Sequence, residues 1–184
     1  DMDFMVTTII FEAHSTSLDN KAGLASGHND VELSELGLKQ SRELGERYAD
    51  QEFDAIFCSD LRRSYETALL AFGDKYLIIK DIRLRECDYG DMTQKPSASV
   101  NPEKANRISV PFLGGESFEQ CCARVADCLK DILVDYEGKT ILIIGHRATQ
   151  YGLEHALNHV PVYEAVTAPW QWQPGWKYEL HTVK

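Results

Sequence analysis

The sequence alternates between short apolar runs and longer amphipathic stretches. The first apolar run, Thr8 to Phe11, is rich in β-branched residues and stops just before His14, where the chain turns polar. Further runs with the length of strands lie at Phe53 to Cys58, Tyr76 to Lys80 and Thr140 to Ile144. Uninterrupted apolar runs are typical of strands that are buried on both faces of a parallel sheet. The pattern therefore predicts four strands.

Amphipathic helices are predicted between these strands. Ser34 is a candidate N-cap for a helix over about 35–49, and Ser117 with Gln120 has the spacing of a capping box before a helix that ends near 136. Ser59 is a candidate N-cap for a helix to about Phe72, and a further helix spans about 149–158. The alternation predicts a three-layer α/β/α sandwich with a mostly parallel sheet, whose polar strand ends gather along one edge.

The length of 184 residues favours a single domain over 1–184. Within it, the polar and proline-containing stretch from about Met92 to Leu113 (92–113) is predicted to be a loop-rich lid. The C-terminal part carries Trp170, Trp172 and Trp176, which either cover a sheet edge or stack on a substrate ring. Covering a sheet edge is the more frequent role, and we expect it here.

Composition narrows the possible partners. The net charge of −10 argues against a general binder of nucleic acid or of an anionic membrane, but a locally positive site could still bind a small anion. No apolar run approaches 18 residues, so no membrane span is predicted, and the first residues lack the pattern of a signal peptide. The five cysteines form an odd set without CxxC spacing, which favours buried free thiols in a reducing cytoplasm.

Four chemically versatile side chains follow the predicted strands: His14, Arg63, Glu86 and His146. Arginine and protonated histidine donate charge-assisted hydrogen bonds that suit phosphoryl oxygens. A neutral histidine can attack phosphorus, and a carboxylic acid can protonate the leaving alcohol and later activate water. The helix N-terminus near Ser59 would add N–H donors for an anion. This chemistry requires neither a metal nor a cofactor, and we expect neither.

Motifs around these residues resemble those of the histidine phosphatase superfamily, which has the phosphoglycerate mutase-like fold. The resemblance covers nearly the whole chain, in matching order. It is carried by His14 with Asn20, by the series Gly27, Asp30, Leu33, Ser34, Gly37 and Gln40, by Ser59-Asp60-Leu61-Arg62-Arg63 with Thr67-Ala68, by Leu84, Glu86, Tyr89 and Gly90, by Gly114-Gly115-Glu116-Ser117, and by the apolar strand before His146.

The resemblance implies roles for these side chains. His14 would be the nucleophile that becomes phosphohistidine, and Arg63 and His146 would hold the phosphoryl oxygens. Glu86 would be the general acid and base. The predicted substrate-binding residues are Asn20, Ser15, Ser17, His28 and Arg147, although a surface position is about as expected for His28. Arg62 is expected at the surface, and the substrate is expected to be a small phosphorylated molecule or a phosphate-like anion.

One departure from the family pattern bears on activity. The arginine that the family places directly before the nucleophile is Ala13 here. Losing its charge-assisted bonds removes roughly 1.5–3 kcal/mol each. Three explanations are open for alanine at this position: a natural subfamily that uses another donor, an engineered substitution, or a degraded phosphatase that only binds its ligand. Arg147, which follows His146, could return the guanidinium to the site, or it could simply face solvent.

The sequence thus predicts a phosphatase that hydrolyses a small phosphomonoester through a phosphohistidine on His14. The alternative is a weak or inactive family member that binds an anionic ligand or a protein partner, and a phosphoglycerate mutase is less expected because the chain is short. His155 and His159 have the i, i+4 spacing of some zinc ligands, but without a third ligand they are interpreted as ordinary helix residues. The substrate itself and the oligomeric state are not readable from the residues.

Overall fold

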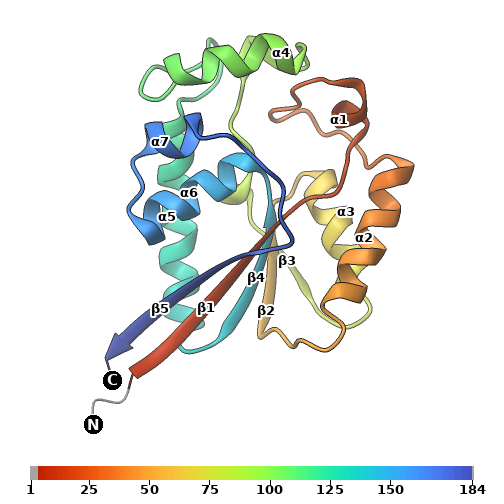
Figure 1. Ribbon diagram of the computed structural model, residues 1–184, viewed down its shortest axis with the longest axis vertical. Helices are drawn as coiled ribbons and strands as arrows, with labels where there is room; N and C mark the ends of the chain where they lie inside the picture. Colours follow the sequence, from red (N-terminus) through yellow and green to blue (C-terminus); the bar gives the residue numbers. More distant parts are fainter. Residues whose placement is uncertain (1–3, 184) are drawn as a thin grey trace.

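A five-stranded sheet forms the middle layer of the protein (Figure 1); the structure, a computed structural model, describes residues 4–183. Its strands are β1 (Phe4–Ala13), β2 (Ala55–Cys58), β3 (Ile78–Lys80), β4 (Thr140–Gly145) and β5 (Trp176–Val183). They lie in the order β3-β2-β4-β1-β5, and only β5 runs antiparallel to its neighbour within this sheet. The predicted mostly parallel α/β sheet is confirmed.

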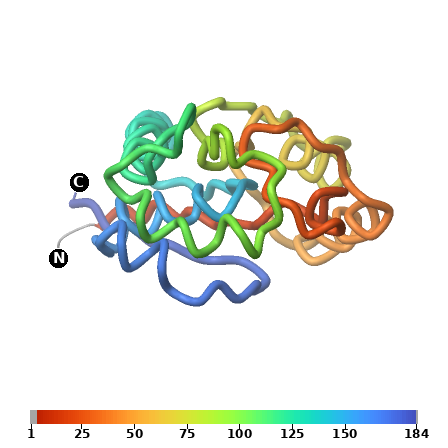
Figure 2. Tube along the Cα trace, turned by 90° about the horizontal axis from the view of Figure 1, so that it is seen from above, coloured from red at the N-terminus to blue at the C-terminus, as the bar shows by residue number. Residues whose placement is uncertain are grey.

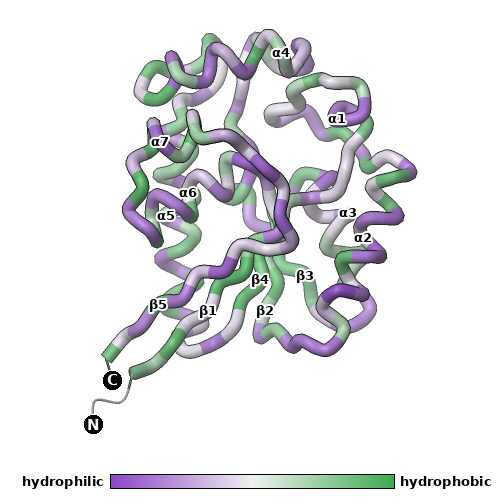
Figure 3. Tube along the Cα trace, in the orientation of Figure 1, coloured by the Kyte–Doolittle hydropathy of each residue, from purple (hydrophilic) through white to green (hydrophobic). Residues whose placement is uncertain are grey.

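Helices cover both faces of the sheet (Figure 1). One face carries α2 (Glu35–Arg47) and α3 (Arg62–Phe72), and the other carries α5 (Phe118–Asp135), α6 (Arg147–Asn158) and α7 (Val162–Thr167). Successive residues of a strand point to opposite faces, so Ile10 packs with α2 and α3 whereas Ile9 packs with α5. Figure 3 shows the resulting apolar centre of the molecule along the parallel strands.

The carboxyl ends of the parallel strands are surrounded by short elements. They are α1 (Leu18–Ala22), α4 (Ser97–Val100) and three 3₁₀ helices, η1 (Ile82–Leu84), η2 (Gly90–Met92) and η3 (Asn101–Asn106). In Figure 2 the segment that contains α4 and η3 passes over this end of the molecule. These elements and the chain before β5 form the walls around the strand ends.

Segment 92–113 has more structure than the predicted loop. It contains α4 and η3, and Val100 and Phe112 are buried in an apolar cluster with Phe118 and Tyr151. Backbone hydrogen bonds also tie it to the chain after α1, where Gln94 donates to the carbonyl of Ala25 over 2.6 Å. Apolar anchoring on one side and backbone pairing on the other therefore hold this segment over the strand ends.

Three sequence-based predictions need correction. Strand β5 was not predicted, because only the aromatic content of this stretch was considered. Helix α6 begins at Arg147 rather than Thr149. Helix α3 begins at Arg62 with Leu61 as its N-cap residue, because the hydroxyl of Ser59 instead hydrogen-bonds the ring of His146.

Three further observations complete the fold. Gln94 has a left-handed φ of 64°, the conformation that glycine adopts most readily. Within residues 4–183, no helix has the length and apolar composition needed to cross a bilayer. All five cysteines are buried, as predicted.

Candidate active site

Strand register brings the two histidines together. In the parallel pair β1 and β4, Ala13 lies opposite Gly145, so the residues that follow both strands are neighbours. The N–H of His14 extends the ladder by donating to the carbonyl of Gly145 over 2.9 Å. The imidazole rings of His14 and His146 consequently lie with their centroids 5.0 Å apart.

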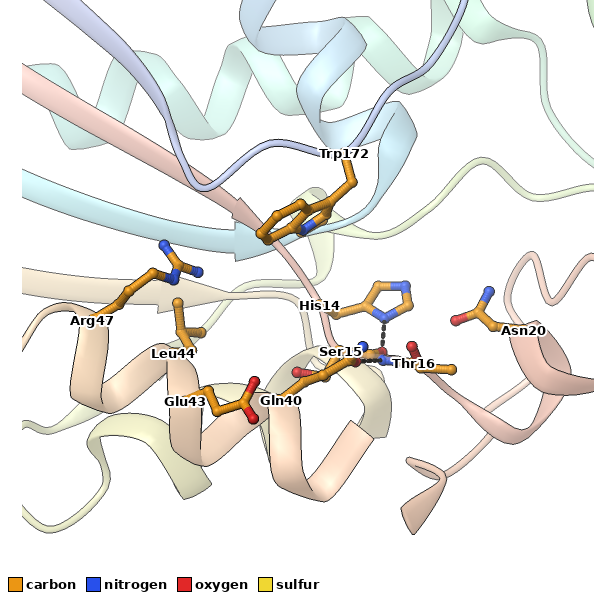
Figure 4. A pocket seen from close by; sticks show the side chains of 10 residues that line it. His14, Ser15, Thr16, Asn20, Gln40, Glu43, Leu44, Arg47 and Trp172 are labelled. Carbon is orange, nitrogen blue, oxygen red and sulfur yellow. Dashed lines mark hydrogen bonds between the residues drawn. The ribbon is translucent and has the colours of Figure 1, made fainter. Parts of the chain in front are cut away.

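The imidazole of His14 is held as a neutral ring with one free lone pair. Its Nδ1 is 2.7 Å from the carbonyl oxygen of Ser15, which can only accept, so Nδ1 carries the proton (Figure 4). Burial, together with the charges of Arg63 and Arg147, lowers the pKa of His14 to about 3, against the raising effect of the Ser15 carbonyl. Nε2 is therefore an unprotonated nitrogen at neutral pH.

His146 has the complementary arrangement. Its Nε2 is 2.7 Å from the hydroxyl of Ser59, and that hydroxyl oxygen already accepts the N–H of Leu61 over 3.3 Å. We assign the Ser59 hydroxyl proton to the bond with Nε2, which places the ring proton of His146 on Nδ1. This buried Nδ1 has no hydrogen-bond partner within residues 4–183. Burial and the charge of Arg63 keep the pKa of His146 well below its ordinary value, so the ring is a neutral donor.

Arg63 and Glu86 complete the group. Arg63 is almost fully buried, and its guanidinium donates to the carbonyls of Asn29 (2.8 Å) and Gly27 (2.7 Å), which leaves further N–H groups for a ligand. One carboxylate oxygen of Glu86 accepts the N–H of Cys87 over 2.8 Å. Burial lowers the pKa of Arg63, and the nearby charge of Glu86 opposes this shift.

Two cavities meet at His14. The larger, of about 530 Å³, contains the strand-end residues Arg63, Glu86 and His146. The smaller, of about 450 Å³, extends along α2. Both are lined by Ala13, His14, Thr16, Asn20 and Trp172. Figure 4 shows the imidazole of His14 between the indole of Trp172 and the loop that carries Thr16 and Asn20. An anion at His14 is thus reachable from two sides.

Two of the predicted substrate-binding residues line the larger cavity. Asn20 lines both cavities, although its side-chain oxygen accepts the N–H of Ser17 and so also caps α1. Arg147 lines the larger cavity, with its guanidinium carbon 5.2 Å from the ring centroid of Trp170. Arg147 is nevertheless an exposed residue, so it lies at the open side of this cavity.

The other three are used for structure. Ser15 lines the smaller cavity, but its hydroxyl accepts a hydrogen bond from Ser41. Ser17 is fully buried, caps α1 and lines neither cavity. The ring of His28 also lies outside both linings and is 2.8 Å from the backbone carbonyl of Glu86. Ser17 and His28 thus shape the loops around the site instead of facing its cavities.

The helix N-terminus near Ser59 is likewise not available to an anion in the cavities. The N–H of Arg62 donates to the carboxylate of Asp30 over 2.7 Å, and Arg62 itself is at the surface, as predicted. Sequence reasoning missed Lys104 from η3 and gave Trp172 no definite site role. Both residues lie in segments that cross over the strand ends, and the local sequence does not indicate this crossing.

The comparison with known families agrees with this geometry. The family model described as histidine phosphatase superfamily (branch 1) matches residues 9–169. The chain belongs to the histidine phosphatase superfamily. The resemblance inferred from the motifs is therefore confirmed.

Several named phosphatases are similar to this chain. The chain is 30% identical over 154 residues to a metal-independent phosphoserine phosphatase of Arabidopsis thaliana, covering 77% of this chain and 64% of the relative. It is also 30% identical to phosphoserine phosphatase 1 of Hydrogenobacter thermophilus, covering 81% of this chain and 75% of the relative. A mycobacterial glucosyl-3-phosphoglycerate phosphatase shares the fold, with a TM-score of 0.82, 22% identity, and coverage of 96% and 97%.

Proposed function

We propose that this protein hydrolyses small phosphomonoesters through a covalent phosphohistidine on His14. The observation that carries the proposal is the pair of imidazoles that line one cavity with their centroids 5.0 Å apart: His14 has an unprotonated Nε2, and His146 has a buried Nδ1 without a hydrogen-bond partner within residues 4–183. A nucleophilic nitrogen beside a donor for phosphoryl oxygens is the arrangement that displacement at phosphorus requires. The relatives named as phosphoserine phosphatases support hydrolysis of a phosphoester.

The reaction proceeds in two displacements. In the first, Nε2 of His14 forms a bond to phosphorus while the bond from phosphorus to the alcohol oxygen breaks, and the carboxylic acid of Glu86 gives its proton to that oxygen. In the second, the carboxylate of Glu86 takes a proton from water, the water oxygen bonds to phosphorus and the P–N bond breaks. The products are the alcohol and inorganic phosphate, and His14 returns to its neutral form.

Arg63 and His146 stabilise the charge on the phosphoryl oxygens. Arg63 is fixed by two carbonyls and His146 by Ser59, so neither must reorganise when charge develops in the transition state. Asn20 retains its amide N–H groups on the opposite wall. These donors come from three separate elements around one phosphoryl position.

We further propose that Arg147 replaces the guanidinium that is missing at Ala13. Arg147 lines the same cavity as His14, its charge contributes to the low pKa of His14, and Trp170 supports its guanidinium. Removing one charge-assisted bond should reduce kcat/KM by about 10- to 100-fold. The Arg147→Gln variant tests this, and Arg62→Gln, which removes an exposed arginine outside both cavities, is the control.

The deciding assay is turnover of 4-nitrophenyl phosphate near pH 6. We expect the chain to be active, His14→Ala to abolish activity, Arg147→Gln to reduce it and Arg62→Gln to retain it. Activity that appears only after Ala13→Arg would show that no donor replaces the missing arginine. If neither the unmodified chain nor Ala13→Arg is active, the alternative is favoured, namely a protein that binds an anionic ligand or a protein partner.

The cysteines support a reducing compartment such as the cytoplasm for this activity, because all five are free and buried.

A further inference from the structure

The proposed general acid, Glu86, lies on a segment without regular structure. Residues 85–89 connect η1 to η2 and belong to no helix or strand. One oxygen of the Glu86 carboxylate accepts the N–H of Cys87 over 2.8 Å, so the orientation of the carboxylate follows that of the adjacent peptide. Proton transfer requires the carboxyl group to lie within hydrogen-bond reach of the leaving oxygen. Segment 85–89 must therefore be held in place by contacts from other elements.

Arg124 on α5 holds the backbone on one side of Glu86. Its guanidinium donates to the carbonyls of Arg83 (2.9 Å), Arg85 (2.8 Å) and Glu86 (2.7 Å). The remaining two N–H groups donate to the carboxylate of Glu116. A guanidinium has five N–H donors in a rigid planar fork, and here all five have an acceptor. The backbone that leads to Glu86 is thereby fixed relative to α5.

Glu116 holds the same segment on the other side of Glu86. Its carboxylate accepts the N–H of Asp88 over 2.9 Å, and its own N–H donates to the carbonyl of Asp88 over 3.0 Å. The two stretches of chain approach closely, because a Cβ at Gly115 would clash with the carbonyl oxygen of Asp88. Since Glu116 also pairs with Arg124, one ion pair fixes the backbone both before and after the general acid.

The ion pair acts at a distance from the phosphoryl position. Arg124 and Glu116 lie outside the linings of both cavities, whereas Glu86 lines the larger one. The two side chains are only 21% and 18% exposed, so water competes little for their hydrogen bonds. Their effect on the reaction must therefore pass through the backbone of residues 85–89.

We propose that the ion pair of Arg124 and Glu116 positions Glu86 for proton transfer to the leaving oxygen. Both are positioning residues, and the inference rests on the proposed phosphatase function. Without the pair, Glu86 would remain in the cavity but would no longer be directed at one point. Protonation of the leaving oxygen would then become slower, whereas Arg63 and His146 would still hold the phosphoryl oxygens.

The test compares two esters that differ in the basicity of the leaving oxygen. 4-Nitrophenyl phosphate releases a weakly basic phenolate that needs little protonation, whereas phenyl phosphate releases a more basic one and depends on the acid. The ratio kcat/KM includes phosphoryl transfer to His14, the step in which the leaving oxygen takes its proton. In Arg124→Gln we expect kcat/KM to fall by about 10- to 100-fold on phenyl phosphate and by a much smaller factor on 4-nitrophenyl phosphate. Arg124→Lys, which keeps a charged donor for the carbonyls, should restore part of the loss.

Two further variants separate positioning from a purely structural role. In a chain that already carries Glu86→Gln, adding Arg124→Gln should lower kcat/KM on phenyl phosphate no further, because no general acid is left to position. Lys130→Gln is the matched control, since Lys130 is an exposed cation of the same helix and lies outside both cavities. It should leave turnover of both esters unchanged.

Equal losses on the two esters in Arg124→Gln would overturn the inference, and so would a further loss in the Glu86→Gln chain. If Arg124→Gln does not fold, Glu116→Gln, which keeps the shape of the side chain, takes its place with the same expectation. Failure of both variants to fold would show that the pair serves the fold alone. Failure of the proposed function gives a different result, because the unmodified chain would then hydrolyse neither ester, which would refute both proposals.

Discussion

Replacing His14 by asparagine should change how the stability of the protein depends on pH. The pKa of His14 is about 3 in the folded protein, against 6.5 for the unperturbed group. Between these values the unfolded chain binds a proton that the folded chain does not, so stability is complete above pH 6.5 and is lost as the pH falls toward 3. At pH 5 the loss amounts to about 2 kcal/mol, because the unfolded-state pKa lies 1.5 units above that pH.

The assay is urea unfolding at pH 7.5 and at pH 5.0 in buffers without phosphate. The loss of unfolding free energy between the two pH values should be about 2 kcal/mol smaller in His14→Asn than in the unmodified chain. Carboxylates and other histidines contribute to the pH dependence of both proteins, so their contributions cancel in this difference. His159→Asn, which removes an exposed imidazole at a left-handed position that asparagine tolerates, should not reproduce the effect. Equal losses in His14→Asn and the unmodified chain would mean that the folded protein accepts the proton on His14, and the account of a neutral nucleophile would be wrong.

Three further variants test packing and orientation. Arg47→Met should reduce the unfolding free energy by about 2 to 3 kcal/mol, because the guanidinium lies 2.6 Å from the buried carboxylate of Glu12. Adding Glu12→Gln to Arg47→Met should recover most of the loss. A double variant no more stable than Arg47→Met would contradict this reasoning. Gly90→Ala should reduce the unfolding free energy by at least about 2 kcal/mol, since φ is +53° and a Cβ would clash with the backbone oxygen of Leu113; thermal unfolding measures this loss. Ser59→Ala should lower kcat/KM by about tenfold with little change in fold, because His146 loses the bond that fixes its tautomer; unchanged kinetics would exclude that positioning role.

The gathering of the four predicted catalytic side chains could be anticipated from local pattern. His14 and His146 each follow an apolar run, and parallel strands deliver such residues to one edge of the sheet. The 5.0 Å separation of the two rings could not be anticipated, because it depends on Ala13 lying opposite Gly145. Pairing register between strands more than a hundred residues apart is a tertiary property.

Other residues were misplaced because tertiary bonds override local preference. Serine is a favoured N-cap, yet Ser59 bonds the ring of His146 and leaves the start of α3 to Leu61. Strand β5 did have a signal, the alternation of Trp176, Tyr178 and Leu180 with polar residues. Lys104 had no such signal in the sequence, because it reaches the cavity only through the position of η3 over the strand ends.

The covalent intermediate on His14 is the central claim, and trapping it is the most direct test. Turnover of 4-nitrophenyl phosphate by Glu86→Gln would be quenched in alkali within the first cycle, and the peptides would be analysed by mass spectrometry. An aryl leaving group needs little protonation, whereas hydrolysis of the intermediate needs Glu86 to activate water, so the phosphoryl enzyme should accumulate. The account predicts one phosphoryl group on the peptide that contains His14, and none in His14→Asn. Release of 4-nitrophenol without any phosphorylation of that peptide would contradict it.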